Sequence, residues 1–173
     1  HSINWHMFGK CGDPIRNWQL ALFADSDLAG CIFTKKSRTG AILVIVGDNT
    51  WLPIGTICSK QGSVATSTPH AELIAADRAT RQLGVPLLAV LERITKRSDL
   101  NLTLEEDNES AIACLKAGYA HTMRELSRLH GVSLASLNNI YCRKPNSNVF
   151  KLKYCPTKKQ VADVFTKSLK TGS

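Results

Sequence analysis

Residues 18–25 have the sequence WQLALFAD, a short apolar run that ends in an acidic residue. A run of this length, bounded by polar residues, predicts a buried strand over residues 18–24 with Asp25 at its end. In open sheets, ligands bind just outside the ends of the strands. The stretch therefore predicts an element of the core and a candidate binding residue beside it.

The elements on either side of this strand predict an α/β fold. Residues 41–46 and 51–59 are predicted strands, joined by a hairpin turn at residues 47–49. Thr68 and Pro69 predict the cap and first turn of a helix over residues 70–83, which Gly84 is expected to end. Further helices are predicted over 86–95, 108–117, 125–129, 132–141 and 158–169, and further strands over 99–104 and 149–154. Three strands followed by alternating helices and strands predict a mixed sheet with helices on both faces.

The length of 173 residues and the hydrophobic content of 43% predict one domain with a substantial core. Residues 1–18 are polar, include two glycines and a proline, and are interpreted as a spacer or linker. The longest apolar runs are far shorter than the ~18–20 residues of a membrane span, and no signal-peptide pattern opens the chain. From these two observations we expect no membrane partner and an intracellular location. The six cysteines contain no C-x-x-C pair, so we expect them to be reduced structural thiols.

The formal net charge of +8 lies entirely in the last third of the chain. Residues 1–116 hold 12 basic and 12 acidic side chains, whereas residues 117–173 hold 10 basic and 2 acidic ones. Such a run is often only a solvated face. The alternative interpretation is a polyanionic partner, most simply nucleic acid.

Four acidic residues occupy positions where sheet folds place chemistry. Asp25 and Asp107 follow predicted strands, Glu72 lies in the first turn of a predicted helix, and Asp163 lies near the start of the last one. Four carboxylates in one cleft repel one another, so together they indicate a divalent cation such as Mg²⁺ or Mn²⁺. Singly, each also has a capping or turn-forming explanation. The same explanations suit five other acidic residues: Asp27, Asp48, Asp77, Asp99 and Glu106.

Five short motifs follow one another along the chain. They are ADSDLAG at 24–30, KKSRTG at 35–40, SKQ…ATST…AELIA within 59–75, EDNESAI at 106–112, and YCPT…VADVFTK within 154–167. In the same order they resemble D-x-D-W-A-G, R-R-S-T-S-G, S-K-K-Q…A-x-S-T-x-E-A-E-Y-I-A, C-D-N-Q-S-A-I and V-P-T-x-x-Q-L-A-D-I-F-T-K. These are motifs of the ribonuclease H domain of copia-type LTR retrotransposon polyproteins. The match is collinear from about residue 21 to residue 170.

The resemblance implies a ribonuclease H-like fold over residues 19–173, with a five-stranded mixed sheet flanked by helices. It implies hydrolysis of the RNA strand of RNA–DNA hybrids as part of reverse transcription. Two Mg²⁺ ions, replaceable by Mn²⁺, would be held by Asp25, Glu72, Asp107 and Asp163. Asp27, the second acid of the first motif, is expected to be structural or peripheral. Implied partners are the hybrid and other domains of a reverse transcriptase polyprotein, in a cytoplasmic retrotransposon particle or in the nucleus.

Candidate substrate-binding residues lie near the motifs and in the basic region. The side chains of Asn108, Glu109 and Ser110 are candidates for reading the 2′-OH that distinguishes RNA from DNA. His70 and His130 are candidates for proton transfer. The candidate phosphate ligands are Lys35, Lys36, Arg38, Lys60, Lys158 and Lys159.

Departures from the family pattern at Leu28, His70 and Leu73 concern the substrate groove and remove no predicted metal ligand. Two alternative functions stay open. One is a non-catalytic nucleic-acid-binding domain of the same fold. The other is an integrase-like nuclease, which would use three carboxylates and cut DNA.

Overall fold

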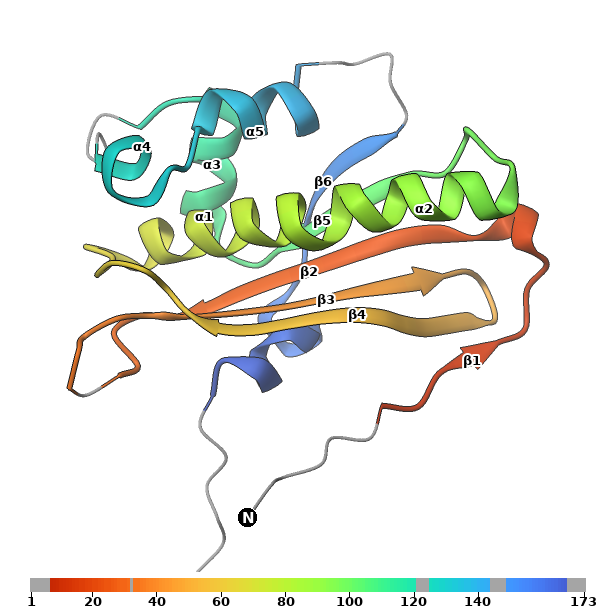
Figure 1. The fold of residues 1–173 in the computed structure, drawn as a ribbon, viewed down its shortest axis with the longest axis horizontal. Coiled ribbons are helices and arrows are strands. Elements are labelled where there is room, and N and C mark those ends of the chain that lie inside the picture. The colour runs from red at the N-terminus through yellow and green to blue at the C-terminus, as the bar shows by residue number, and fades with distance from the viewer. Residues whose placement is uncertain (1–6, 32, 121–124, 144–148, 168–173) are drawn as a thin grey trace, which may run out of the picture.

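The computed structural model describes residues 7–31, 33–120, 125–143 and 149–167, and the side chains of all of these except Glu125 and Leu129. Its centre is a mixed sheet with the strand order β1-β4-β3-β2-β5-β6 (Figure 1). Strands β1 to β4 pair antiparallel, whereas β2, β5 and β6 run parallel. The strands are β1 (Lys10–Cys11), β2 (Gln19–Asp27), β3 (Arg38–Val46), β4 (Thr50–Lys60), β5 (Leu102–Glu106) and β6 (Phe150–Tyr154).

Strand β2 lies at the middle of the sheet and separates two apolar clusters. Leu20, Leu22 and Ala24 belong to the large core between the sheet and the helices. Ala21 and Phe23 belong to a smaller cluster on the opposite face. Alternate residues of a strand point to opposite faces, so a run that is apolar throughout is buried on both sides. This confirms the strand predicted from residues 18–25.

Helices cover one face of the sheet, the upper face in Figure 1. They begin with an unbroken helical run from residue 68 to residue 95. It consists of α1 (Thr68–Ala79), a π-helical turn η2 (Thr80–Gly84) and α2 (Val85–Thr95). The predicted cap at Thr68 was wrong by one residue, because Ser67 accepts from the His70 amide. The predicted stop at Gly84 was also wrong. A Cβ on Gly84 would lie 2.9 Å from the side chains of Leu22 and Leu102, so glycine lets the helix approach the sheet closely.

Three shorter helices complete this layer (Figure 1): α3 (Glu109–Ala117), α4 (Glu125–His130) and α5 (Leu134–Tyr141). Helices α3 and α5 pack against β6, and α4 packs against α1. The Asn108 side chain caps α3 by accepting from the amide of Ala111 at 3.0 Å. Gly131 separates α4 from α5 with a φ of +67°, a conformation that favours glycine. The predicted break at Gly131 is therefore confirmed.

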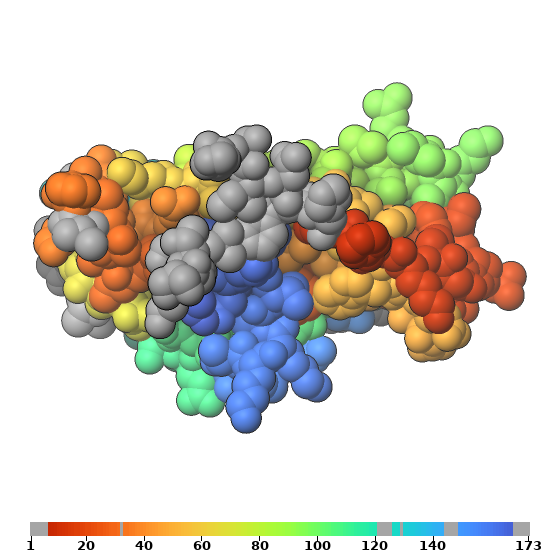
Figure 2. Space-filling model, turned by 90° about the horizontal axis from the view of Figure 1, so that it is seen from below, coloured from red at the N-terminus to blue at the C-terminus, as the bar shows by residue number. Residues whose placement is uncertain are grey.

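The lower face carries the C-terminal segment, shown in blue in Figure 2. A helix was predicted over residues 158–169, but the described part forms two 3₁₀ turns, η4 (Thr157–Lys159) and η5 (Val161–Phe165). Residues 168 and 169 lie outside the described part. Gln160 between the turns is extended, because its buried amide donates to the carbonyls of Ala24 at 3.0 Å and Glu105 at 3.3 Å. This double contact fixes the segment across the ends of β2 and β5 and interrupts the helix.

The segment before β2 contributes a sixth strand to the five that were predicted. Lys10 and Cys11 pair with Trp51 and Thr50 of β4, and a 3₁₀ turn η1 (Ile15–Asn17) follows. All six cysteines are free thiols. In the described part of the chain, no helix is long and apolar enough to cross a membrane.

Candidate metal centre

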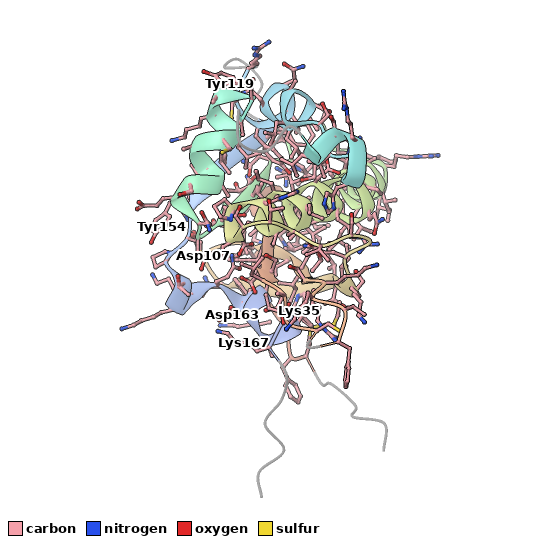
Figure 3. The ribbon with its side chains drawn as sticks, turned by 90° about the vertical axis from the view of Figure 1, so that its left-hand side faces the viewer. Lys35, Asp107, Tyr119, Tyr154, Asp163 and Lys167 are labelled. Atoms are coloured by element: carbon pink, nitrogen blue, oxygen red, sulfur yellow. The ribbon has the colours of Figure 1, made fainter. Side chains whose placement is uncertain are left out.

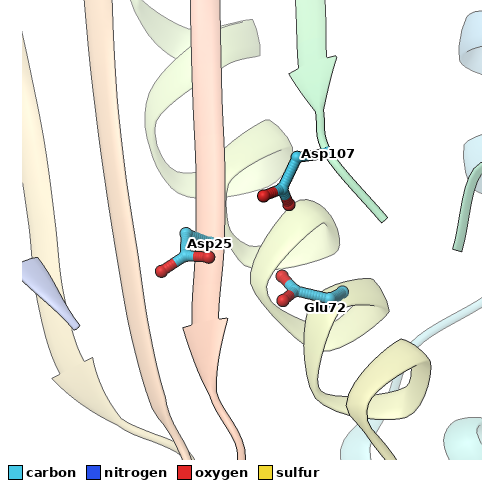
Figure 4. Close-up of side chains that lie close together, drawn as sticks. All are labelled: Asp25, Glu72 and Asp107. Carbon is cyan, nitrogen blue, oxygen red and sulfur yellow. The ribbon is translucent and has the colours of Figure 1, made fainter. Parts of the chain in front are cut away.

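Three of the four predicted carboxylates meet at one end of the sheet. Asp25 lies near the end of β2, Asp107 directly follows β5, and Glu72 lies in the first turns of α1 (Figures 3 and 4). Each offers an oxygen within 4.8 Å of the others. Phe23 of β2 is in register with Glu105 of β5, so the residues two positions further along the parallel strands reach the same edge.

Burial makes this cluster electrostatically costly without a counter-ion. Burial, opposed by a hydrogen bond from Thr166 and supported by Asp163 and Asp107, raises the pKa of Asp25 to about 6. Burial together with the charges of Glu106, Asp25 and Asp107 raises the pKa of Glu72 to about 10. Buried carboxylates shift in this direction when they lack a compensating cation. The site therefore favours bound protons or a bound metal ion.

Glu106 is a further carboxylate beside this centre. From sequence it had only a capping or turn-forming explanation. It is fully buried, and burial raises its pKa to about 8. One of its oxygens accepts from the Asn108 amide at 3.2 Å. The predicted strand ended at residue 104. Extending the alternation of Leu102 and Leu104 by one more step would have placed Glu106 on the buried face.

The donor set fits a divalent cation of the Mg²⁺ or Mn²⁺ type. All donors are carboxylate oxygens, which these ions prefer. Glu72 Oε2 and Glu106 Oε2 are both buried and have no hydrogen-bond partner in the described structure. A buried charged oxygen without a partner is expensive, and a cation held by Asp25, Glu72 and Asp107 would compensate the charge beside both.

Asp163 stands apart from the group of three. It lies in η5, and its carboxylate accepts from the Lys167 ammonium one turn later. It is nevertheless close enough to Asp25 to raise the pKa of that group. Figure 3 shows Asp107, Asp163 and Lys167 at the same end of the molecule. Asp163 therefore borders the centre, and its role as a ligand stays a prediction.

The predicted phosphate ligands fall into two groups. Lys35 and Arg38 are exposed near the start of β3, where Lys36 donates to the Gly62 carbonyl and the Lys60 ammonium lies 3.4 Å from Cys31 Sγ. The second group is Lys158 and Lys159, both exposed on η4. Binding of phosphate by either group stays a prediction.

The residues after Asp107 have mixed surroundings. The Asn108 side-chain oxygen is engaged in capping α3, whereas Glu109 and Ser110 are exposed in the first turn of that helix. The Asp27 carboxylate accepts from the Arg38 amide at 2.8 Å, a contact that joins β2 to β3, and Asp27 is not part of the group of Asp25, Glu72 and Asp107. The predicted 2′-OH readers are therefore accessible at Glu109 and Ser110, and reading of the 2′-OH remains a prediction.

The two predicted proton-transfer histidines contact each other, with ring centroids 4.8 Å apart in an edge-on arrangement. His70 is 1% exposed, and its Nδ1 lies 2.9 Å from the Thr66 hydroxyl. His130 lies beside the Ser63 hydroxyl at 3.1 Å. Among the described residues, neither histidine is part of the candidate metal site formed by Asp25, Glu72 and Asp107. Proton transfer by either one stays a prediction.

Comparison with known proteins adds one structural likeness. No family model matches the sequence. The chain is similar in structure to LC11-RNase H1, an enzyme isolated from compost by a metagenomic approach, with a TM-score of 0.50 and 16% sequence identity. The match covers 85% of this chain and 91% of that chain. Together with the six-stranded mixed sheet and its flanking helices, this likeness shows that the chain has a ribonuclease H fold.

Proposed function

We propose that this protein is an endoribonuclease that hydrolyses the RNA strand of RNA–DNA hybrids with divalent metal ions. The observation that carries the proposal is the group formed by the buried Asp25 and Glu72 and the half-buried Asp107, each of which offers an oxygen within 4.8 Å of the others. The collinear motifs of the sequence and the ribonuclease H fold support it independently.

The three converging carboxylates would hold the ion, and Asp163 at the border of the centre is the candidate to share a second one. When bound, divalent cations supply positive charge that activates water and stabilises the charge developing on the scissile phosphate. The chain's own residues would place the substrate. Glu109 and Ser110 would lie along the RNA strand near Asp107, and the exposed lysines and arginine would bind backbone phosphates.

The retrotransposon context is part of the proposal and rests on the motifs alone. We infer a domain of a reverse transcriptase polyprotein that removes the RNA template after DNA synthesis. It would act in the cytoplasmic particle or the nucleus, where the hybrid is made.

The test is incubation of the protein with labelled RNA–DNA hybrid, double-stranded RNA and double-stranded DNA, each with Mg²⁺, Mn²⁺ or EDTA. We expect cleavage of the RNA strand of the hybrid only, and no cleavage in EDTA. Cleavage of DNA would favour the integrase-like alternative. Binding of the hybrid without cleavage in either metal would favour a non-catalytic nucleic-acid-binding domain.

A further inference from the structure

The side chain of Gln160 bridges the ends of the two strands that lead to the metal centre. In the parallel pairing of β2 with β5, the last residues in register are Phe23 and Glu105. At that end of the ladder, the Gln160 side-chain amide donates one hydrogen bond to the Ala24 carbonyl at 3.0 Å and another to the Glu105 carbonyl at 3.3 Å. Gln160 therefore continues the connection between the strands where their own pairing ends.

Every polar group of this amide is used. The nitrogen makes the two bonds to the strands, and the oxygen accepts from the Ala162 amide at 3.4 Å. Gln160 is only 4% exposed, so water has little access to replace these bonds. A buried polar network whose members are all satisfied holds its side chains in one arrangement. The separation of the Ala24 and Glu105 carbonyls is thus tied to the dimensions of one planar amide group.

The two bridged carbonyls lie close in the chain to carboxylates of the centre. Asp25 is the residue after Ala24, and Asp107 lies two residues after Glu105. Figure 4 shows the side chains of Asp25 and Asp107 at the ends of the two neighbouring strands. Because both acids are so near to the bridged carbonyls, the bridge limits how far the two carboxylates can move apart.

Gln160 also fixes the start of η5, the turn that carries Asp163. Its side-chain oxygen caps the turn at Ala162, and its backbone carbonyl accepts from the Asp163 amide at 3.3 Å. Figure 3 shows Asp163 at the same end of the molecule as Asp107. One residue therefore connects β2, β5 and η5, three elements that carry or adjoin predicted ligands.

From these contacts we infer that Gln160 is a positioning residue of the metal centre, which holds Asp25 and Asp107 at a separation that one divalent cation can bridge. The inference deepens the proposed function and rests on it for the presence of the cation. Without the bridge, the strand ends would be free to respond to the repulsion between the two carboxylates, which is strong at short range inside a protein. Residues that orient metal ligands typically contribute about 10–100-fold to metal affinity.

The test measures Mn²⁺ affinity by calorimetry in the absence of nucleic acid, so that catalysis plays no part. Gln160→Met retains the approximate length and the apolar stem of the side chain but removes both donors. The carbonyls of Ala24 and Glu105 then receive no hydrogen bond from residue 160. We expect the affinity for Mn²⁺ to fall about 10–100-fold.

Asn138→Leu is the matched control, because Asn138 is another buried amide that bridges two carbonyls. It is 3% exposed and donates to the carbonyls of Leu115 and Lys116, both at 2.8 Å. These carbonyls lie at the end of α3 that is remote from Asp107. Both substitutions should lower the melting temperature in EDTA by several degrees. Only Gln160→Met should weaken Mn²⁺ binding when it is measured well below that temperature.

Gln160→Asn provides a milder variant, which keeps the amide on a side chain one carbon shorter. The shorter amide should reach one of the two carbonyls but not both. We therefore expect Mn²⁺ affinity to lie between those of the wild type and Gln160→Met, with a loss of about three- to tenfold. This variant tests the bridge even if Gln160→Met does not fold.

Three results would overturn the inference. They are wild-type Mn²⁺ affinity in the Gln160 variants, an equal loss of affinity in Asn138→Leu, and absence of Mn²⁺ binding by the wild type. The proposed nuclease is judged separately by cleavage of the hybrid. Mn²⁺ binding that depends on Gln160, without cleavage of the hybrid, would keep the assignment of Gln160 and reject the nuclease. Cleavage of the hybrid with unchanged Mn²⁺ affinity in the Gln160 variants would reject the positioning role alone.

Discussion

The Thr166 hydroxyl donates a hydrogen bond to Asp25 Oδ2 and so joins the C-terminal segment to the metal centre. Thr166 is 2% exposed, and the bond opposes the rise that burial causes in the pKa of Asp25. We predict that Thr166→Val weakens Mn²⁺ binding, measured by calorimetry, about three- to tenfold. That corresponds to the ~1 kcal/mol of one hydrogen bond. Thr166→Ser keeps the hydroxyl and should bind nearly as the wild type does. Equal losses in both variants would assign the effect to packing.

Asp107→Asn should abolish cleavage while hybrid binding survives or improves. The substitution preserves the shape of the side chain but removes a charge that holds metal and repels phosphate. Changes to the partners of metal ligands already cost about 10–100-fold, so we expect a loss of more than about 100-fold in turnover. Single-turnover cleavage and anisotropy with hybrid in Ca²⁺ measure the two effects. Turnover at the wild-type rate in Mg²⁺ would show that Asp107 is structural.

The metal-free protein should become less stable as the pH rises. Burial raises the pKa of Asp25 to about 6, of Glu106 to about 8 and of Glu72 to about 10. The folded state therefore binds more protons than the unfolded state, and stability falls as the pH passes from about 4.5 through these values. We expect a lower melting temperature in EDTA at pH 8.5 than at pH 5.5.

Two comparisons make that pH prediction specific. Mg²⁺ should recover most of the loss at pH 8.5, because the ion replaces the protons. Glu106→Gln should reduce the loss, whereas Glu109→Gln on the exposed first turn of α3 should leave it unchanged. A melting temperature that rises with pH in EDTA would contradict the prediction.

Lys158 and Lys159 should contribute phosphate contacts if the basic C-terminal third follows the hybrid. Changing both to Ala should flatten the slope of log affinity against log salt by about one to two units, and weaken binding to all hybrid sequences alike. Turnover at saturating substrate should change little, since these side chains are exposed on η4 and hold no metal. The measurement is a salt titration of hybrid binding in Ca²⁺. An unchanged slope would identify the two lysines as a solvated face.

Gly84→Ala should destabilise the protein by about 1–3 kcal/mol, although alanine is the better helix former. The added Cβ would lie 2.9 Å from the Leu22 and Leu102 side chains, which are fully buried. Gly62→Ala is the control, because a Cβ added there would have no atom within 4 Å, and it should change stability by less than about 0.5 kcal/mol. Thermal unfolding measures both. A stabilised Gly84→Ala would mean that helix and sheet separate easily.

The features that sequence predicted well are those with a local signal. The apolar run before Asp25 predicted β2, and the acidic residues at 25, 72 and 107 were found from short strings of neighbouring residues. The errors lie where tertiary contacts override local propensity. Gly84 continues a helix because the sheet is close, and Gln160 interrupts one because it bonds to two strand ends. Glu106 was missed because its burial depends on the true end of β5.

The parallel pairing of β5 with β2 joins segments that are far apart in the sequence, so the ribosome makes Asp25 and Glu72 well before Asp107. Strands β2 to β4 and helix α1 are joined by short connections and can assemble as the first half of the chain leaves the ribosome. At that stage Asp25 and Glu72 are present without Asp107. Docking of β5 then requires a non-local contact and brings the half-buried Asp107 and the buried Glu106 into place. Docking of β5 is thus the step that charge repulsion opposes, and we expect a divalent cation present at that step to accelerate it.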